Sequence, residues 1–179
     1  MKSNTYLKYM IVVLVGLNIF LTSCESEHGI EPKPIPEQEF GFGGNIVFYG
    51  AWPDTVKLVV LIVFKDPLLT PEDFVITNVG FLRNPLPLGI QTFKYSSFDS
   101  SIVPLTQMDP PPSEYHYAAV ASAKEFSLSR EDWFVRGVYY ANGNTSTPGT
   151  ISIPKDGYVD NINIYCDFDN PPPQPPGGN

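Results

Sequence analysis

Several carboxylates near the C-terminal end of the chain have a spacing that could serve metal binding. Asp156 and Asp160 flank a turn, while Asp167 and Asp169 alternate along the last predicted strand and so project from one side, about 7 Å apart. Loop carboxylates at the end of a β domain can bind calcium, which takes roughly six to eight oxygen ligands. The pair Asp156-Gly157 is also a common hairpin turn, and charges on an edge strand discourage pairing with another chain. We favour these structural explanations and keep calcium as the alternative.

Common catalytic motifs are missing from the sequence. It contains no Gly-x-Ser-x-Gly, His-Glu-x-x-His, Cys-x-x-Cys or phosphate-binding glycine loop. His28 and His116 are far apart in the chain, and His116 falls in a predicted strand, where we expect a surface or half-buried position. We therefore predict no catalytic residues and no cofactor. A hydrolase that uses Asp156, Asp160 or Asp167 is the alternative.

Cys166 lies in a segment of alternating apolar residues. The alternation would place it on one face of a strand together with Ile162, Ile164 and Phe168. No histidine or second cysteine is spaced to assist it as a reactive or metal-binding group. We expect a buried thiol that acts as a small apolar side chain.

Cys24 ends an N-terminal segment with the features of a secretory signal peptide. Two lysines precede an apolar run over residues 9–20, and small residues then lead to the cysteine. The run has about 12 residues, whereas a helix that crosses a bilayer takes roughly 20. We predict cleavage between Ser23 and Cys24, the alternatives being an ordinary signal peptide or an uncleaved anchor.

The sequence Leu21-Thr22-Ser23-Cys24 resembles the lipobox of bacterial lipoproteins. The resemblance implies that the Cys24 sulfur receives a diacylglyceryl group and that its new amino terminus is acylated, for example with palmitate. Two or three acyl chains hold a protein stably to a membrane, where a single chain is marginal. Glu25 stands where aspartate would act as an inner-membrane retention signal, so we expect the outer membrane of a Gram-negative bacterium. Glu25 and Glu27 also resemble a surface-export signal, which makes surface exposure a further expectation.

The acidic composition argues against nucleic acid as a partner. Eleven basic and nineteen acidic residues give a formal charge of −8, and removal of residues 1–23 leaves nine basic residues, a charge of −10. Phosphate backbones demand clustered Lys and Arg. The partners we expect are the membrane, through the lipid, and other envelope proteins or glycans.

Proline-rich segments flank a single predicted domain. Residues 24–38 have prolines at every second position from 32 to 36, which favours an extended tether. Residues 170–179 carry no large apolar side chain, so we predict a disordered or extended tail. The domain between them spans residues 39–169.

That domain is predicted to be all-β. Residues 56–64 (VKLVVLIVF) are nearly all apolar and often β-branched, which is typical of a strand buried on both faces. Nineteen prolines argue against a helical core, since each interior proline costs a helix about 3 kcal/mol. Seven or eight short strands favour an antiparallel sandwich or barrel. The predicted strands cover residues 46–49, 56–64, 74–77, 91–95, 115–121, 133–140, 149–153 and 159–168, with a helical turn at 127–132.

Four stretches of the chain resemble transthyretin-like (prealbumin-like) domains of bacterial surface lipoproteins. They are GNIVFYGAWPDTVKLVVLIVF, YHYAAVA, WFVRGVYY and ISIPKDGYVDNINIYCDF, which together span most of residues 44–168. The related carboxypeptidase regulatory-like domains share the opening Gly-x-Ile/Val strand. The resemblance implies an antiparallel, Ig-like β-sandwich that serves adhesion, binding or architecture.

Aromatic residues are the remaining candidates for ligand contact. The chain has Trp52, Trp133, ten tyrosines and twelve phenylalanines. Exposed rings can stack on sugars, so Trp52 and Trp133 are candidate ligand-binding residues, with Trp52 expected to be the more exposed. Sandwich cores also use aromatic side chains routinely, and core packing is the alternative. The sequence therefore predicts a non-enzymatic binding or structural module, with a glycan-binding surface as the alternative function.

Overall fold

The computed structural model describes residues 40–83, 85–98, 108–155 and 157–178. Ser23, Cys24 and the predicted tether lie outside these residues. Within them the chain forms ten strands, and its helical segments are 3-10 turns of three residues each, which confirms the predicted all-β class. The strands are β1 (Gly41–Tyr49), β2 (Leu58–Phe64), β3 (Val79–Arg83), β4 (Thr92–Ser96), β5 (Ser113–Tyr115), β6 (Tyr117–Ala123), β7 (Phe134–Val138), β8 (Ile151–Ile153), β9 (Tyr158–Val159) and β10 (Ile164–Asp167). The 3-10 turns are η1 (Pro71–Asp73), η2 (Ile76–Asn78), η3 (Arg130–Asp132) and η4 (Ala141–Gly143).

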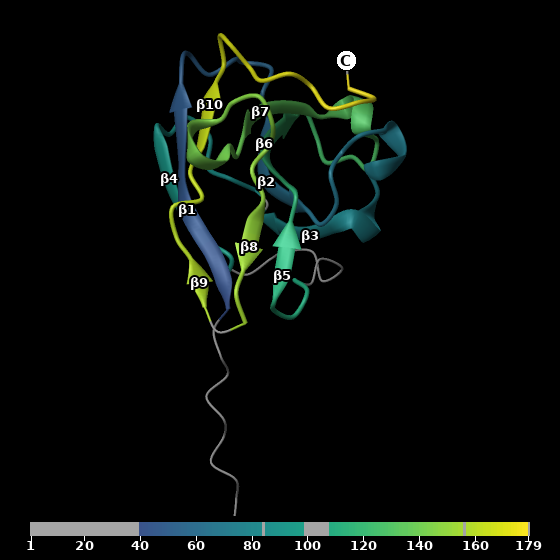
Figure 1. Ribbon diagram of the computed structural model, residues 1–179. Coiled ribbons are helices and arrows are strands. Elements are labelled where there is room, and N and C mark those ends of the chain that lie inside the picture. Colours follow the sequence, from purple (N-terminus) through teal and green to yellow (C-terminus); the bar gives the residue numbers. More distant parts are fainter. Residues whose placement is uncertain (1–39, 84, 99–107, 156, 179) are drawn as a thin grey trace, which may run out of the picture. The chain divides into compact units, whose positions relative to one another are not determined.

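The strands form two larger sheets and one small one (Figure 1). One larger sheet has the order β10-β1-β4, with β9 paired to the start of β1, and the other has the order β3-β2-β6-β7. Strands β5 and β8 form the small sheet. Strand β1 runs parallel to β9 and β10, so the predicted purely antiparallel arrangement is wrong at this sheet. Parallel neighbours need a crossover, and here the chain passes through the other sheet before it returns to β1.

Strand β2 lies in the interior of its sheet, between β3 and β6. Its alternate side chains enter two different apolar clusters, with Leu61 on one face and Val60 and Phe64 on the other. This arrangement confirms the prediction of a strand buried on both faces, and it explains why the segment has no polar alternation.

One of these clusters, here called the inner cluster, combines side chains from both larger sheets. Phe42 of β1, Leu61 of β2 and Ile164 of β10 are fully buried in it. The Phe42 ring meets Phe81 edge-on, with ring centres 5.4 Å apart. The residues of the inner cluster are Phe42, Ile46, Phe48, Val56, Val59, Leu61, Val63, Phe81, Leu86, Tyr95, Tyr115, Ala118, Val120, Ile151, Ile153, Ile162, Ile164, Cys166 and Phe168.

The two larger sheets approach each other closely where β7 meets β10. An isolated antiparallel bridge joins Tyr139 to Ile164. A Cβ atom at Gly137 would lie 2.6 Å from the carbonyl oxygen of Tyr165 and 2.7 Å from the Cys166 sulfur. Glycine is therefore the residue that fits this contact.

Three predicted strands differ from the structure. The strand predicted at 115–121 is divided at His116, which separates β5 from β6 and lies in neither strand. Residues 74–77 belong to the segment of η1 and η2, because the Asp73 carboxylate accepts hydrogen bonds from the backbone N–H groups of Leu69 and Thr70 (2.8 and 2.7 Å) and folds the chain into turns. The predicted strand 159–168 divides into β9 and β10, with Asn161 between them in the left-handed region at φ 67°. Strand β3, which sequence reasoning missed, pairs with β2 in this part of the sheet.

The C-terminal tail, predicted to be disordered or extended, packs against β7 over its described residues (170–178). The Gln174 amide forms two hydrogen bonds with the backbone of Val135, accepting from the N–H at 2.8 Å and donating to the carbonyl at 2.9 Å. Proline has no N–H group, so a Pro-Pro-Pro-Gln-Pro-Pro segment cannot form a regular ladder. A single side-chain amide supplies the contact instead, and Pro175 beside it is buried.

Candidate functional site: an apolar cavity beneath the C-terminal tail

The outer face of the β3-β2-β6-β7 sheet carries the second apolar cluster, here called the outer cluster. Its residues are Val60, Phe64, Val79, Leu82, Tyr117, Ala119, Ala121, Ala123, Trp133, Val135 and Val138. No second sheet covers this face among the described residues. The side chains that pack over the sheet come from residues 68–76, residues 126–133 and the tail.

This cover leaves a cavity of about 310 Å³. Val60, Ile62, Ala119 and Ala121 line it from the sheet. The two alanines stand where larger strand residues would fill the space, so the small side chains of β6 help to create the hollow. The remaining lining residues are Phe64, Leu68, Phe74, Val75, Ile76, Val79, Leu82, Tyr117, Phe126, Ser127, Leu128, Arg130, Trp133, Val135 and Pro175.

Large apolar side chains on two loops line the cavity and also reach solvent. Leu128 is 72% exposed and Phe126 is 49% exposed on one loop, and Val75 is 47% exposed on the other. An exposed apolar patch beside a cavity is a common sign of a binding site. These residues form an apolar entrance to the cavity.

Arg130 is the one charged residue that lines the cavity among the described residues. It is only 7% exposed. Its Nη1 donates to the carbonyl of Trp133 at 2.5 Å and its Nη2 donates to the carbonyl of Pro175 at 3.1 Å. The guanidinium carbon lies 5.8 Å from the centre of the Phe74 ring. Burial lowers the pKa of Arg130, while the neighbouring phenol of Tyr117 raises it.

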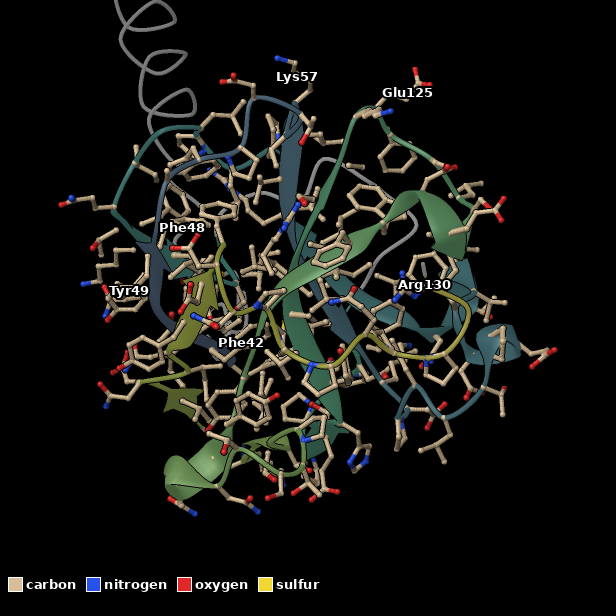
Figure 2. All side chains as sticks on the ribbon, turned by 90° about the horizontal axis from the view of Figure 1, so that it is seen from above. Phe42, Phe48, Tyr49, Lys57, Glu125 and Arg130 are labelled. Carbon is tan, nitrogen blue, oxygen red and sulfur yellow. The ribbon has the colours of Figure 1, made fainter. Side chains whose placement is uncertain are left out.

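The tail covers Arg130 closely. A Cβ atom at Gly178 would collide with the Arg130 guanidinium, so the tail can lie this close to the guanidinium because residue 178 is a glycine. Figure 2 shows Arg130 beside the yellow C-terminal tail, on the opposite side of the domain from Tyr49. Arg130 thus joins η3, the tail and the cavity in one place.

The two tryptophans predicted to contact a ligand have different positions. Trp52 is half-buried, with its ring 4.7 Å from that of Phe48 and 4.8 Å from that of Phe168, and its indole N–H donates to the carbonyl of Ile90. Trp133 is buried, and its N–H donates to the carbonyl of Ser127 at 2.8 Å. Trp133 lines the cavity and Trp52 does not, and Trp52 is the more exposed of the two, as predicted.

The aspartates that were the weaker, calcium-binding alternative do not form a metal site in the described residues. Asp156 lies outside them, and Asp160 and Asp169 are exposed. The Asp167 carboxylate accepts hydrogen bonds from the backbone N–H groups of Asp169 (2.9 Å) and Asn170 (3.1 Å), which lower its pKa. Across residues 40–83, 85–98, 108–155 and 157–178, no three His, Cys, Asp or Glu side chains are grouped so as to hold a metal ion.

Cys166 and His116 lie outside the cavity. Cys166 is fully buried in the inner cluster together with Ile162, Ile164 and Phe168, which confirms the predicted face, and burial raises the pKa of its thiol. His116 is partly exposed, as predicted, with its Nδ1 atom 3.3 Å from the Thr150 hydroxyl.

Sequence reasoning missed an exposed aromatic pair on the other sheet. Tyr49 of β1 and Tyr165 of β10 are 50% and 58% exposed, and their rings stack with centres 6.4 Å apart. The alternation along β10 could have predicted that Tyr165 is exposed, because its neighbours Ile164 and Cys166 are buried and side chains alternate between the two faces of a strand.

Sequence reasoning also missed Arg130 and the cavity itself. The available signals were two exposed apolar residues, Phe126 and Leu128, in an otherwise polar segment, and alanines at alternate positions of β6. Neither signal identifies a cavity without the positions of the covering loops.

Comparison of this chain with protein-family models, with curated proteins and with solved structures found no match. Among the described residues, no helix has the length and apolar character needed to cross a membrane.

Proposed function

We propose that this chain is a non-enzymatic binding module that holds an apolar small molecule in the cavity of the outer cluster. The observation that carries the proposal is the cavity volume of about 310 Å³ with an almost wholly apolar lining. Protein interiors are close-packed, with few voids larger than a water molecule. Ligand pockets typically begin at about 300 Å³ and have mainly apolar and aromatic walls with few polar groups.

The proposal includes the setting inferred from the sequence. Lipidation of Cys24 would hold the mature chain in the cell envelope of a Gram-negative bacterium, at the outer membrane. The two larger sheets that share the inner cluster are compatible with a transthyretin-like sandwich as the scaffold. A module held at a membrane by its own lipid would be close to a source of apolar molecules.

A titration with an uncharged apolar dye such as N-phenyl-1-naphthylamine tests the cavity. Dye fluorescence should rise on binding, with energy transfer from Trp133 in the cavity wall. The variant Ala121→Leu should weaken dye binding at least about tenfold, because the larger side chain would occupy the part of the cavity next to the sheet. Ala51→Leu adds the same volume at an exposed position that does not line the cavity, and it should bind as the wild type does. Equal binding by both variants would exclude the cavity as the dye site.

Intact-mass spectrometry of protein extracted from membranes tests the anchor. We expect a mass for residues 24–179 plus two or three acyl chains, and the loss of those chains in a Cys24→Ala variant. An unlipidated soluble species would contradict the lipoprotein part of the proposal without affecting the cavity.

The stacked tyrosines favour glycan binding as a second candidate function. The exposed rings of Tyr49 and Tyr165 lie on a sheet surface, where sugar rings could stack on them. A glycan-array screen of the wild type and of Tyr165→Ala tests this candidate. Binding that persists unchanged in Tyr165→Ala would contradict it.

A further inference from the structure

We infer that the ligand of this cavity is an amphipathic carboxylic acid whose carboxylate binds Arg130 and whose apolar chain lies along the sheet. The inference rests on the proposed function and adds the chemical class of the ligand. It follows from the hydrogen bonding of Arg130, the charges around it and the volume of the cavity.

Arg130 has unused hydrogen-bonding capacity in a buried position. A guanidinium carries five N–H donors, and two of those of Arg130 donate to the carbonyls of Trp133 and Pro175, which leaves three. The Nε atom is buried and has no hydrogen-bond partner among the described residues. A buried donor without a partner costs roughly 1–3 kcal/mol, and more when the group is charged. The Nε atom is enclosed by protein atoms, so the groups left for a ligand are the second N–H of Nη1 and the second N–H of Nη2.

Arg130 also has no counter-ion among the described residues, although the protein is acidic. The chain has nineteen acidic residues, yet within the described part of the chain no carboxylate lies within 4 Å of the Arg130 guanidinium. Its neighbours Glu131 and Asp132 are exposed and accept hydrogen bonds from Ser129 and Ser127 instead. Removing a charge from water is costly unless an opposite charge accompanies it. A carboxylate suits this need, because it matches the planar guanidinium fork with two parallel hydrogen bonds.

The remaining walls exclude other head groups. The lining contains no acidic side chain among the described residues, so an ammonium group would find no negatively charged partner in the cavity. The other polar groups are the hydroxyls of Tyr117 and Ser127, besides the Trp133 N–H, which donates to the Ser127 carbonyl. The charge of the site is therefore positive, and it favours an anion over a neutral or cationic ligand.

The cavity volume limits the length of the apolar chain. An apolar cavity of about 150 Å³ takes one benzene, or six carbon atoms. The cavity of about 310 Å³ thus has room for on the order of twelve carbons. The exposed apolar residues Val75, Phe126 and Leu128 provide an entrance for such a chain. A saturated medium-chain fatty acid fits all of these conditions.

Competition against the bound naphthylamine dye tests the inference on the full chain. Laurate, 1-dodecanol and dodecylamine share one chain length and differ in the head group. The wild type should bind laurate at least about tenfold more tightly than dodecanol and should bind dodecylamine most weakly. In Arg130→Gln the laurate preference should fall below about threefold, while dodecanol affinity stays unchanged. Glutamine keeps N–H donors at this position but removes the positive charge.

Arg136→Gln is the matched control. Arg136 is a half-buried arginine of this domain, with its Nε donating to the Ser122 hydroxyl at 2.8 Å, but it does not line the cavity. Its variant should keep the full laurate preference. If Arg130→Gln does not fold, the three ligands compared on the wild type still decide the matter.

The outcomes separate the inference from the proposed function. Equal affinity for laurate and dodecanol on the wild type, or an unchanged laurate preference in Arg130→Gln, would overturn the acid-binding inference and leave an apolar site. Failure of the dye and of all three ligands to bind would overturn the proposed function, and the inference with it.

Discussion

The two faces of the β3-β2-β6-β7 sheet are built from the same strands but are covered differently. On the inner face, Val59, Leu61 and Val63 meet side chains of the other larger sheet, and they are fully buried. On the outer face, Val60 and Ile62 meet loops, 3-10 turns and the tail, and a cavity of about 310 Å³ remains. The pattern of apolar residues along β2 is equally strong on both faces.

The difference shows how the type of cover determines the function of a face. Two sheets present regular rows of side chains that interdigitate, so the inner face is filled. Loops and a proline-rich tail do not present such rows, and they leave space between their few anchor points, such as Gln174 and Arg130. The inner face therefore stabilises the domain, while the outer face has the space to bind a ligand.

The largest expected effect comes from truncating neighbouring residues on opposite faces of β2. Leu61→Ala should destabilise the domain by about 3–5 kcal/mol, because it opens a void in the filled inner cluster. Ile62→Ala should cost about 1–2 kcal/mol, because Ile62 is partly exposed and already borders a cavity. Urea unfolding of the two variants measures both values. Equal losses would show that the two faces are packed alike.

Enlarging two neighbouring alanines of β6, instead of truncating residues of β2, should again destabilise the inner face more than the outer face. Ala118→Leu would overpack the inner cluster and should cost about 1–3 kcal/mol. Ala119→Leu would extend into the cavity and should change the free energy of unfolding by less than about 1 kcal/mol, while it weakens dye binding. Thermal unfolding and dye titration together check this pair. A large loss of stability in Ala119→Leu would mean that the outer face has no free space.

Removing the Gln174 side chain should loosen the cover of the outer face. Gln174→Ala loses two hydrogen bonds to Val135 and should cost about 1–2 kcal/mol. Hydrogen exchange of the Val135 amide should become faster, and Gln91→Ala, a change at an exposed glutamine, serves as the control. Unchanged protection of Val135 would show that the tail does not hold this edge.

The smallest expected effect concerns the Cys166 thiol of the inner face. Burial raises its pKa, so the thiol should resist iodoacetamide in the folded protein and react once urea unfolds it. Below the pKa of the unfolded thiol, about 8.5, burial of the neutral thiol contributes fully to the stability of the fold. As pH rises from there toward the pKa of the folded thiol, this contribution is lost, and the free energy of unfolding should fall by about 1 kcal/mol or less at pH 9. In Cys166→Ala this decrease in the free energy of unfolding at alkaline pH should be absent. Rapid labelling of the native protein would show that the inner face opens readily.

Some of the fold was predictable because its causes are local. Alternation at residues 162–168 and the unbroken apolar run of β2 follow from the period of a strand, and the structure confirms both. The serine and acidic residues at 127–132 predicted a helical turn, which appears as η3. The strand predicted at 74–77 failed because hydrogen bonds to the Asp73 carboxylate outweighed the β propensity of Phe74, Val75 and Ile76.

The sequence by itself determined the all-β class, the doubly buried β2 and the buried thiol, because each depends on side chains a few positions apart. Only the tertiary structure decided the parallel pairing of β1, the place of the tail and the cavity. The cavity is lined by residues from the ranges 60–82 and 117–135 and by residue 175. The cavity volume is the space that the side chains of these separate segments leave unfilled. No local pattern records that Arg130 is buried without an acidic partner among the described residues, since burial and charge pairing arise only when distant segments pack together.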